Sequence, residues 1–179
     1  MSLFNNYFQK LEDVYLREFG TLPTVTYTDS INKSLLIGDM NEDGEIQWKA
    51  VKQEKNIDWE NLEKIFGFTV NEELREYYST YRFLTITGSV SDIYFRLFPL
   101  GVTREAERDI KQQLADGKYD FPASQIFLIG EASVGQDDSY FVYYNNLTKE
   151  VFCYDRETKH KVFMAESLTA LFSIIKVEY

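Results

Sequence analysis

The stretch that decides the fold runs from residue 126 to residue 175 and reads IFLIGEASVGQDDSYFVYYNNLTKEVFCYDRETKHKVFMAESLTALFSII. It holds short runs rich in aromatic and β-branched residues at 126–129, 140–144, 151–154 and 161–164. Polar segments with glycine, asparagine or aspartate separate these runs, and such residues favour turns. After the last run, Ser167 precedes Leu168, Leu171, Phe172 and Ile175 at helical spacing. The stretch therefore predicts a β-meander followed by a capped helix.

Upstream of the meander the sequence predicts helices and further strands. Apolar residues at helical spacing predict an amphipathic helix over 4–19, ended by Gly20. Two helices are expected after Asp58 and Asn71, which are good N-cap residues. Strands are expected at 83–87 and 93–98, around a turn at 88–91. A polar helix is expected to begin at Thr103, run to about residue 114 and stop at 116–117, an Asp-Gly pair.

These elements together predict an α+β fold in a single domain, 1–179. Its sheet is expected to be mixed or antiparallel, with a C-terminal β-meander and helices packed on one side. Residues 1–57 would form an N-terminal helix and hairpin extension, and 58–179 the core. The length of 179 residues is sufficient to bury a core without disulfides, and the single cysteine, Cys153, fits a reducing compartment. With no apolar run long enough to span a bilayer, we expect no membrane insertion and a cytoplasmic location.

The charge of the chain favours a basic partner. Its net charge is −10, and between residues 120 and 155 there are six acidic residues against one basic residue, Lys149. Such acidity disfavours binding to nucleic-acid phosphates or anionic membranes. A surface that is acidic for solubility alone would give the same count.

One segment resembles a calcium loop. Asp39, Asn41 and Asp43 occupy positions 1, 3 and 5 of an EF-hand-like pattern, with Gly44 at position 6. Position 12 is Ala50 where a bidentate glutamate is needed, and the flanks at 35–38 and 45–48 have the pattern of strands. Asp-Gly between two apolar runs is a hairpin signal. We interpret the segment as a turn, with calcium as the alternative.

Catalytic residues are hard to find in the sequence. His160 lies between two lysines at the start of a strand, and Cys153 alternates with apolar strand residues. We expect an exposed histidine and a buried small hydrophobe rather than a base and a nucleophile. We find no phosphate-binding glycine loop and no zinc spacing, and we predict no cofactor and no enzymatic activity. An enzyme that uses buried carboxylates stays open, because such pairs meet only in the fold.

The order of several motifs resembles a known superfamily. The segments WENLEKIFG at 59–67 and NEELREYY at 71–78 are similar to the opening helix pair of the SUKH superfamily, which groups Smi/Knr-type and Syd proteins. Phe121-Pro122, 126–130, Gly135-Gln136-Asp137, Val151-Phe152 and 165–168 resemble its second half. The added N-terminal helix, hairpin and polar helix make the full-length layout similar to the Syd branch.

The resemblance implies a binding surface instead of an active site. Many bacterial members of the superfamily are immunity proteins that neutralise polymorphic toxins, often nucleases, and Syd binds the cytosolic side of SecY. Both partners are basic, so acidity does not choose between them. We expect immunity through an acidic surface around an aromatic anchor. The candidate carboxylates are Asp92, Glu131, Asp137 and Asp138, and the candidate anchors are Tyr140 and Tyr143.

Overall fold

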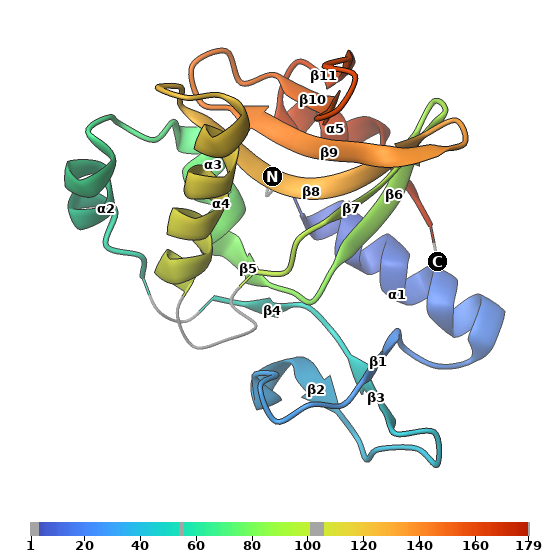
Figure 1. Cartoon of the computed structure of the whole chain (residues 1–179). Helices are drawn as coiled ribbons and strands as arrows, with labels where there is room; N and C mark the ends of the chain where they lie inside the picture. The colour runs from blue at the N-terminus through green and yellow to red at the C-terminus, as the bar shows by residue number, and fades with distance from the viewer. Residues whose placement is uncertain (1–3, 54–55, 101–105, 179) are drawn as a thin grey trace.

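The computed structural model describes residues 4–53, 56–100 and 106–178, and its main feature is a curled antiparallel sheet of seven strands (Figure 1). In spatial order the strands are β11 (Lys161–Ala165), β10 (Val151–Asp155), β9 (Asp137–Asn145), β8 (Ile126–Val134), β7 (Ile93–Leu97), β6 (Ile86–Val90) and β12 (Lys176–Val177). Every neighbouring pair is antiparallel. The predicted α+β class and the meander are confirmed.

The N-terminal region holds a helix and a small sheet. Helix α1 (Asn5–Phe19) ends at Gly20, whose φ of 71° is left-handed, as the glycine predicted. The small sheet has the order β1 (Thr24–Thr26), β3 (Glu45–Trp48) and β2 (Leu36–Ile37), with the 3₁₀ helix η1 (Lys33–Leu35) before β2. The hairpin of β2 and β3 is therefore as predicted, whereas β1 was not predicted. Phe4, Tyr7 and Trp48 belong to the same buried cluster as the main sheet.

Helix starts follow the local sequence signals. Asp58 caps α2 (Trp59–Phe66) by accepting from the N–H of Asn61, and Asn71 caps α3 (Glu72–Thr80) in the same way. Ser167 caps α5 (Leu168–Ile174). Each cap satisfies a backbone donor that the first helical turn leaves free. Strands β4 (Val51–Lys52) and β5 (Tyr81–Arg82) pair with each other beside this helical part.

Helix α4 (Ala106–Asp120) corrects one prediction. The helix does not stop at the Asp-Gly pair but passes through Gly117 to Asp120. A Cβ atom on Gly117 would lie 2.0 Å from the carbonyl oxygen of Ile126, so glycine here serves close packing of the helix on β8. The predicted cap, Thr103, lies outside the described residues.

A second correction concerns the first hairpin of the main sheet. The predicted strand 83–87 and turn 88–91 are displaced along the chain, because β6 runs through Gly88 to Val90 and the turn is reduced to Ser91 and Asp92. A Cβ on Gly88 would lie 2.4 Å from the side chain of Ile175. Gly88 therefore accommodates the C-terminal segment that adds β12 to the sheet edge.

The two faces of the main sheet are both covered in part. The larger buried cluster contains Phe95, Val142 and Cys153 and extends to residues of α3 and α5. A smaller cluster on the other face, here called the outer face, contains Leu128, Tyr143 and Phe152. Phe121, which follows α4, packs against Tyr143 with ring centroids 5.2 Å apart. The end of α4 thus closes the part of the outer face formed by β9 and β10.

Candidate functional site

Two hairpin turns meet at one end of the main sheet. The β6–β7 turn contains Ser91 and Asp92, and the β8–β9 turn contains Gly135 and Gln136; the N–H of Gly135 donates to the carbonyl oxygen of Asp92 at 3.1 Å. Gly135 has a φ of 62°, which glycine adopts without strain. Figure 1 shows both turns together at the right of the view. Chain segments more than forty residues apart are therefore joined at this end.

This contact brings three of the predicted carboxylates together. Asp92 lies in the β6–β7 turn, and Asp137 and Asp138 begin β9 directly after the β8–β9 turn. All three are exposed, and we call them the acidic tip. None of the three forms an ion pair with any residue in the described ranges. Asp137 accepts from the N–H and the hydroxyl of Ser139 through one carboxylate oxygen. The acidic tip therefore presents unneutralised negative charge to solvent.

Glu131 has a different environment from the other predicted carboxylates. It lies in the middle of β8, opposite Arg96 of β7, and the two side chains form an ion pair at 2.5 Å. Both side chains are about half exposed, and such pairs contribute roughly 0–1 kcal/mol. Arg96 neutralises the charge of Glu131, so this residue adds little to the field of the acidic tip.

The predicted aromatic anchors are buried. Tyr140 is 6% exposed and its hydroxyl lies 2.8 Å from Nδ1 of His160. Tyr143 is fully buried, and its hydroxyl donates to Asp120 at 2.5 Å. Burial and the Asp120 carboxylate both raise the pKa of the Tyr143 hydroxyl. Neither ring is available as an exposed anchor, and Tyr143 in particular belongs to the small cluster of the outer face.

Tyr94, rather than Tyr140 or Tyr143, supplies an exposed aromatic ring near the acidic tip. It lies in β7, where burial alternates along the strand, and its side chain is 45% exposed. The alternation of Ile93, Phe95 and Leu97 with Tyr94 and Arg96 was the signal that could have found it. Tyr94 is an exposed aromatic residue that lines the same hollow as Asp138 of the acidic tip.

That hollow, here called the tip groove, has a volume of about 440 Å³ on the outer face of β7, β8 and β9. Its lining residues are Tyr94, Arg96, Glu131, Ala132, Ser133, Asp138, Tyr140 and Phe141. The small side chain of Ser133 leaves space beside Tyr94, its partner across β7 and β8, whereas the side chain of Ala132 belongs to the larger buried cluster. Asp138 belongs to both features, so the acidic tip and the tip groove form one continuous surface.

The far wall of the tip groove is held rigidly by an aromatic and ionic cluster. The guanidinium carbon of Arg156 lies 4.0 Å from the ring centroid of Phe141. Arg156 also pairs with the buried carboxylate of Asp120 at 2.9 Å. Asp120 also accepts from the hydroxyl of Tyr143, so its carboxylate positions both Arg156 and Tyr143. The cluster explains why Phe141 stays at the surface although it is apolar.

The side chains considered for catalysis are buried or already hydrogen-bonded. Cys153 is fully buried, and burial raises its pKa to about 12. His160 is exposed, as predicted. Asp155 is buried, and its carboxylate accepts from the N–H groups of Glu157 and Thr158, so it closes its own turn. In the part of the chain that the structure describes, no group of three or more His, Cys, Asp or Glu side chains is placed to hold a metal ion.

The calcium-like segment has the geometry of a hairpin turn. The Oδ1 atom of Asn41 accepts from the N–H groups of Asp43 and Glu45 at 3.0 and 2.8 Å. An oxygen that closes the turn in this way faces the backbone rather than a cation. Asp39 and Asp43 are exposed on either side of it. The geometry supports the interpretation of these residues as a turn between β2 and β3.

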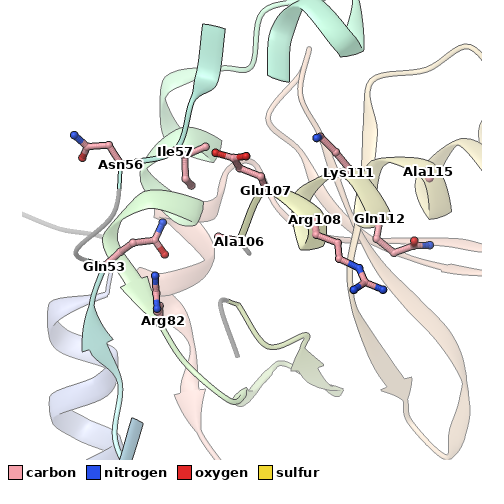
Figure 2. Close-up of a pocket in the computed structure, with 10 residues that line it drawn as sticks. All are labelled: Gln53, Asn56, Ile57, Arg82, Ala106, Glu107, Arg108, Lys111, Gln112 and Ala115. Atoms are coloured by element: carbon pink, nitrogen blue, oxygen red, sulfur yellow. The ribbon is translucent and has the colours of Figure 1, made fainter. Parts of the chain in front are cut away.

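A larger hollow, of about 580 Å³, lies away from the tip between α4 and the chain that links β4 to α2 (Figure 2). Figure 2 shows Gln53 and Arg82 on one side of it and side chains of α4 on the other. We call it the α4 pocket. No sequence pattern pointed to it, because its walls come from three separate segments.

Comparisons with known proteins add no identification: the chain matches no protein-family model and no curated protein. In the described ranges no helix is both long and apolar enough to cross a bilayer. The acidic tip, the tip groove and the α4 pocket are the surface features of the described residues that bear on function.

Proposed function

We propose that this chain is a protein-binding domain whose acidic tip and tip groove hold a basic partner protein. The observation that carries the proposal is the contact of Gly135 with Asp92, because it gathers carboxylates from two hairpins at the rim of one groove. Unpaired charges of one sign at an exposed end steer an oppositely charged partner and raise its association rate. The net charge of −10 acts in the same direction.

The tip groove supplies the short-range part of the interaction. Tyr94 is about half exposed and Phe141 partly exposed, and both rings are held by a paired strand. Rigid aromatic residues in a hollow, surrounded by polar groups, are the usual energetic centre of protein interfaces. In this proposal the acidic tip sets the rate of encounter and Tyr94 sets the lifetime of the complex.

The partner we propose is a toxin domain, which makes the chain an immunity protein. Two features support this: the similarity of its motifs to the SUKH superfamily, and the order of its elements, with a helix pair before an antiparallel meander and a closing helix. A nuclease toxin presents a basic face for phosphates, which matches the acidic tip. The proposal places the chain in the cytoplasm, and its single buried cysteine is compatible with a reducing compartment.

The first experiment identifies the partner. The intact chain serves as bait for affinity purification from lysate of its source cells at low and moderate salt, with mass spectrometry of the eluate. We expect recovery of the toxic domain of a secreted protein and its loss as salt rises. Recovery of SecY would replace immunity with a Syd-like role at the translocon. Recovery of neither would count against protein binding and return attention to catalysis.

The second experiment locates the binding surface. The test variant reverses the charges of the acidic tip and changes the net charge by six: Asp92→Lys, Asp137→Lys, Asp138→Lys. The control variant changes the net charge equally at exposed positions of the β2–β3 hairpin: Asp39→Lys, Glu42→Lys, Asp43→Lys. We expect only the first variant to lose the partner. A further pair, Tyr94→Ala against the more exposed Tyr119→Ala, separates the groove from general aromatic exposure. Equal losses within either pair would place the interface elsewhere.

A further inference from the structure

The α4 pocket gathers positive charge in an acidic protein. The chain has 19 basic and 29 acidic residues, yet the pocket is lined by Arg82, Arg108 and Lys111 against one carboxylate, Glu107. That carboxylate accepts from the N–H of Asp58 at 3.2 Å, at the start of α2. Among the described residues none of the three cations has an ion-pair partner. The local charge of the pocket is therefore opposite to that of the whole chain.

The wall formed by β5 and its neighbour holds buried polar atoms without partners. Nε of Arg82 and Oε1 of Gln53 are buried and make no hydrogen bond within the described ranges. Their backbones are fixed, since Arg82 pairs with Val51 across β4 and β5 and the N–H of Gln53 donates to Thr80. Buried donors and acceptors are nearly always satisfied in folded proteins. Unsatisfied groups that line a hollow are explained by a ligand that completes them.

The opposite wall is one stripe of helix α4. Arg108, Lys111, Gln112 and Ala115 lie at i, i+3, i+4 and i+7, so they face the same side. Figure 2 shows these side chains projecting from successive turns of the helix. The short side chain of Ala115 leaves room at one end of the hollow. The long cationic side chains, by contrast, are exposed and free to adjust to a bound group.

We propose that the α4 pocket binds a phosphorylated small molecule of nucleotide size. Three cations from two walls match the charge of a phosphate chain, and arginine binds phosphate oxygens in a bidentate manner. The amides of Gln53 and Gln112 provide donors and acceptors for the uncharged part, and Ile57 gives it an apolar surface. The volume of about 580 Å³ is within the range of ligand pockets. This inference is independent of the acidic tip and of its partner.

The test is isothermal titration calorimetry of the full chain with ADP, inorganic pyrophosphate and adenosine. We expect ADP and pyrophosphate to bind with an affinity that falls as salt rises, and adenosine to bind at least about tenfold more weakly. The variant Arg108→Gln, Lys111→Gln should weaken ADP binding by about tenfold or more. The control Lys10→Gln, Lys118→Gln changes net charge equally at exposed positions outside the pocket and should leave binding within about twofold.

Three results would overturn this inference. These are an absence of binding heat from ADP and pyrophosphate at millimolar concentration, an affinity for adenosine equal to that for ADP, and a control variant that binds ADP as weakly as the pocket variant. Arg82→Gln is a second probe on the opposite wall, and its fold is checked by circular dichroism before titration. A folded Arg82→Gln protein that binds ADP normally would also contradict the two-wall geometry.

Discussion

The substitution Gly117→Ala separates the effect of local helix propensity from that of tertiary packing. Glycine inside a helix costs about 1 kcal/mol relative to alanine, so propensity alone predicts a more stable protein. In the structure a Cβ at this position would meet the carbonyl oxygen of Ile126 at 2.0 Å, where an ordinary contact begins at 3.4 Å. The obstacle is backbone on both sides and cannot be relieved by a rotamer change.

The expected magnitude follows from these opposing effects. Forcing α4 away from β8 is an overpacking change that costs about 3 kcal/mol, the upper part of the usual range. Subtracting a propensity gain of about 1 kcal/mol leaves a net loss of about 2 kcal/mol. For a chain of this size such a loss lowers the Tm by roughly 4–8 °C. Urea unfolding and scanning calorimetry of the parent and variant proteins measure both quantities.

Ala115→Gly is the matched control on the same helix. Ala115 is exposed, so this change should cost only the propensity difference of about 1 kcal/mol. The account predicts that both variants are less stable than the parent. A Gly117→Ala protein as stable as the parent, or more stable, would refute the close approach of α4 and β8.

Three further predictions concern buried side chains. Tyr78→Phe should lower the free energy of unfolding by about 1–3 kcal/mol, because it leaves Oε1 of Gln113 without the donor that lies 2.7 Å away. Tyr77→Phe should lower it by about 0.5 kcal/mol at most, because the Tyr77 hydroxyl has no partner among the described residues. Urea unfolding of the two variants compares these values. Hydrogen bonds from Thr158 and Glu157 lower the pKa of Asp155 below its ordinary value of 3.8, so Asp155→Asn should destabilise the protein at pH 7. This penalty should begin to shrink as the pH falls below 3.8, where the unfolded chain takes up the proton first, and should disappear only below the lowered pKa of the folded carboxylate; denaturation at a series of pH values from 7 downward tests the sign. Burial raises the pKa of Cys153 to about 12, so Ellman's reagent should modify it at pH 8 only after unfolding in urea, and rapid modification of the folded chain would contradict its burial.

Much of the fold could be predicted because its signals are local. The caps at Asp58, Asn71 and Ser167 satisfy donors within three residues of themselves, so their helices begin where the sequence indicated. The meander was equally clear, since its strands are short, aromatic and separated by polar turns. These features need no knowledge of the rest of the chain.

The errors have long-range causes. Gly117 has the local appearance of a helix stop, and only the neighbouring backbone of Ile126 explains why it lies inside α4. Gly88 looks like a turn residue, yet it makes room for Ile175 against the sheet. Local sequence pattern contains neither contact, so no refinement of propensity would have found them.

The candidate site was predictable only in part. Asp137 was found as an exposed turn carboxylate, and its meeting with Asp92 depends on the order of strands, which the sequence left open. The predicted anchors are buried for two reasons: the end of α4 covers Tyr143 on the outer face, and Tyr140 belongs to the larger buried cluster. The α4 pocket was missed because Arg82 and Arg108 come from distant segments.

The measurement that tests the central claim most directly is the association rate of the captured partner with three forms of the chain. These are the parent, the variant reversed at Asp92, Asp137 and Asp138, and the variant reversed at Asp39, Glu42 and Asp43. The account predicts that the tip variant associates about tenfold or more slowly at low salt and loses its salt dependence, because electrostatic steering has been removed. The hairpin variant should keep both. Equal slowing of the two variants, or an unchanged tip variant, would contradict binding at the acidic tip.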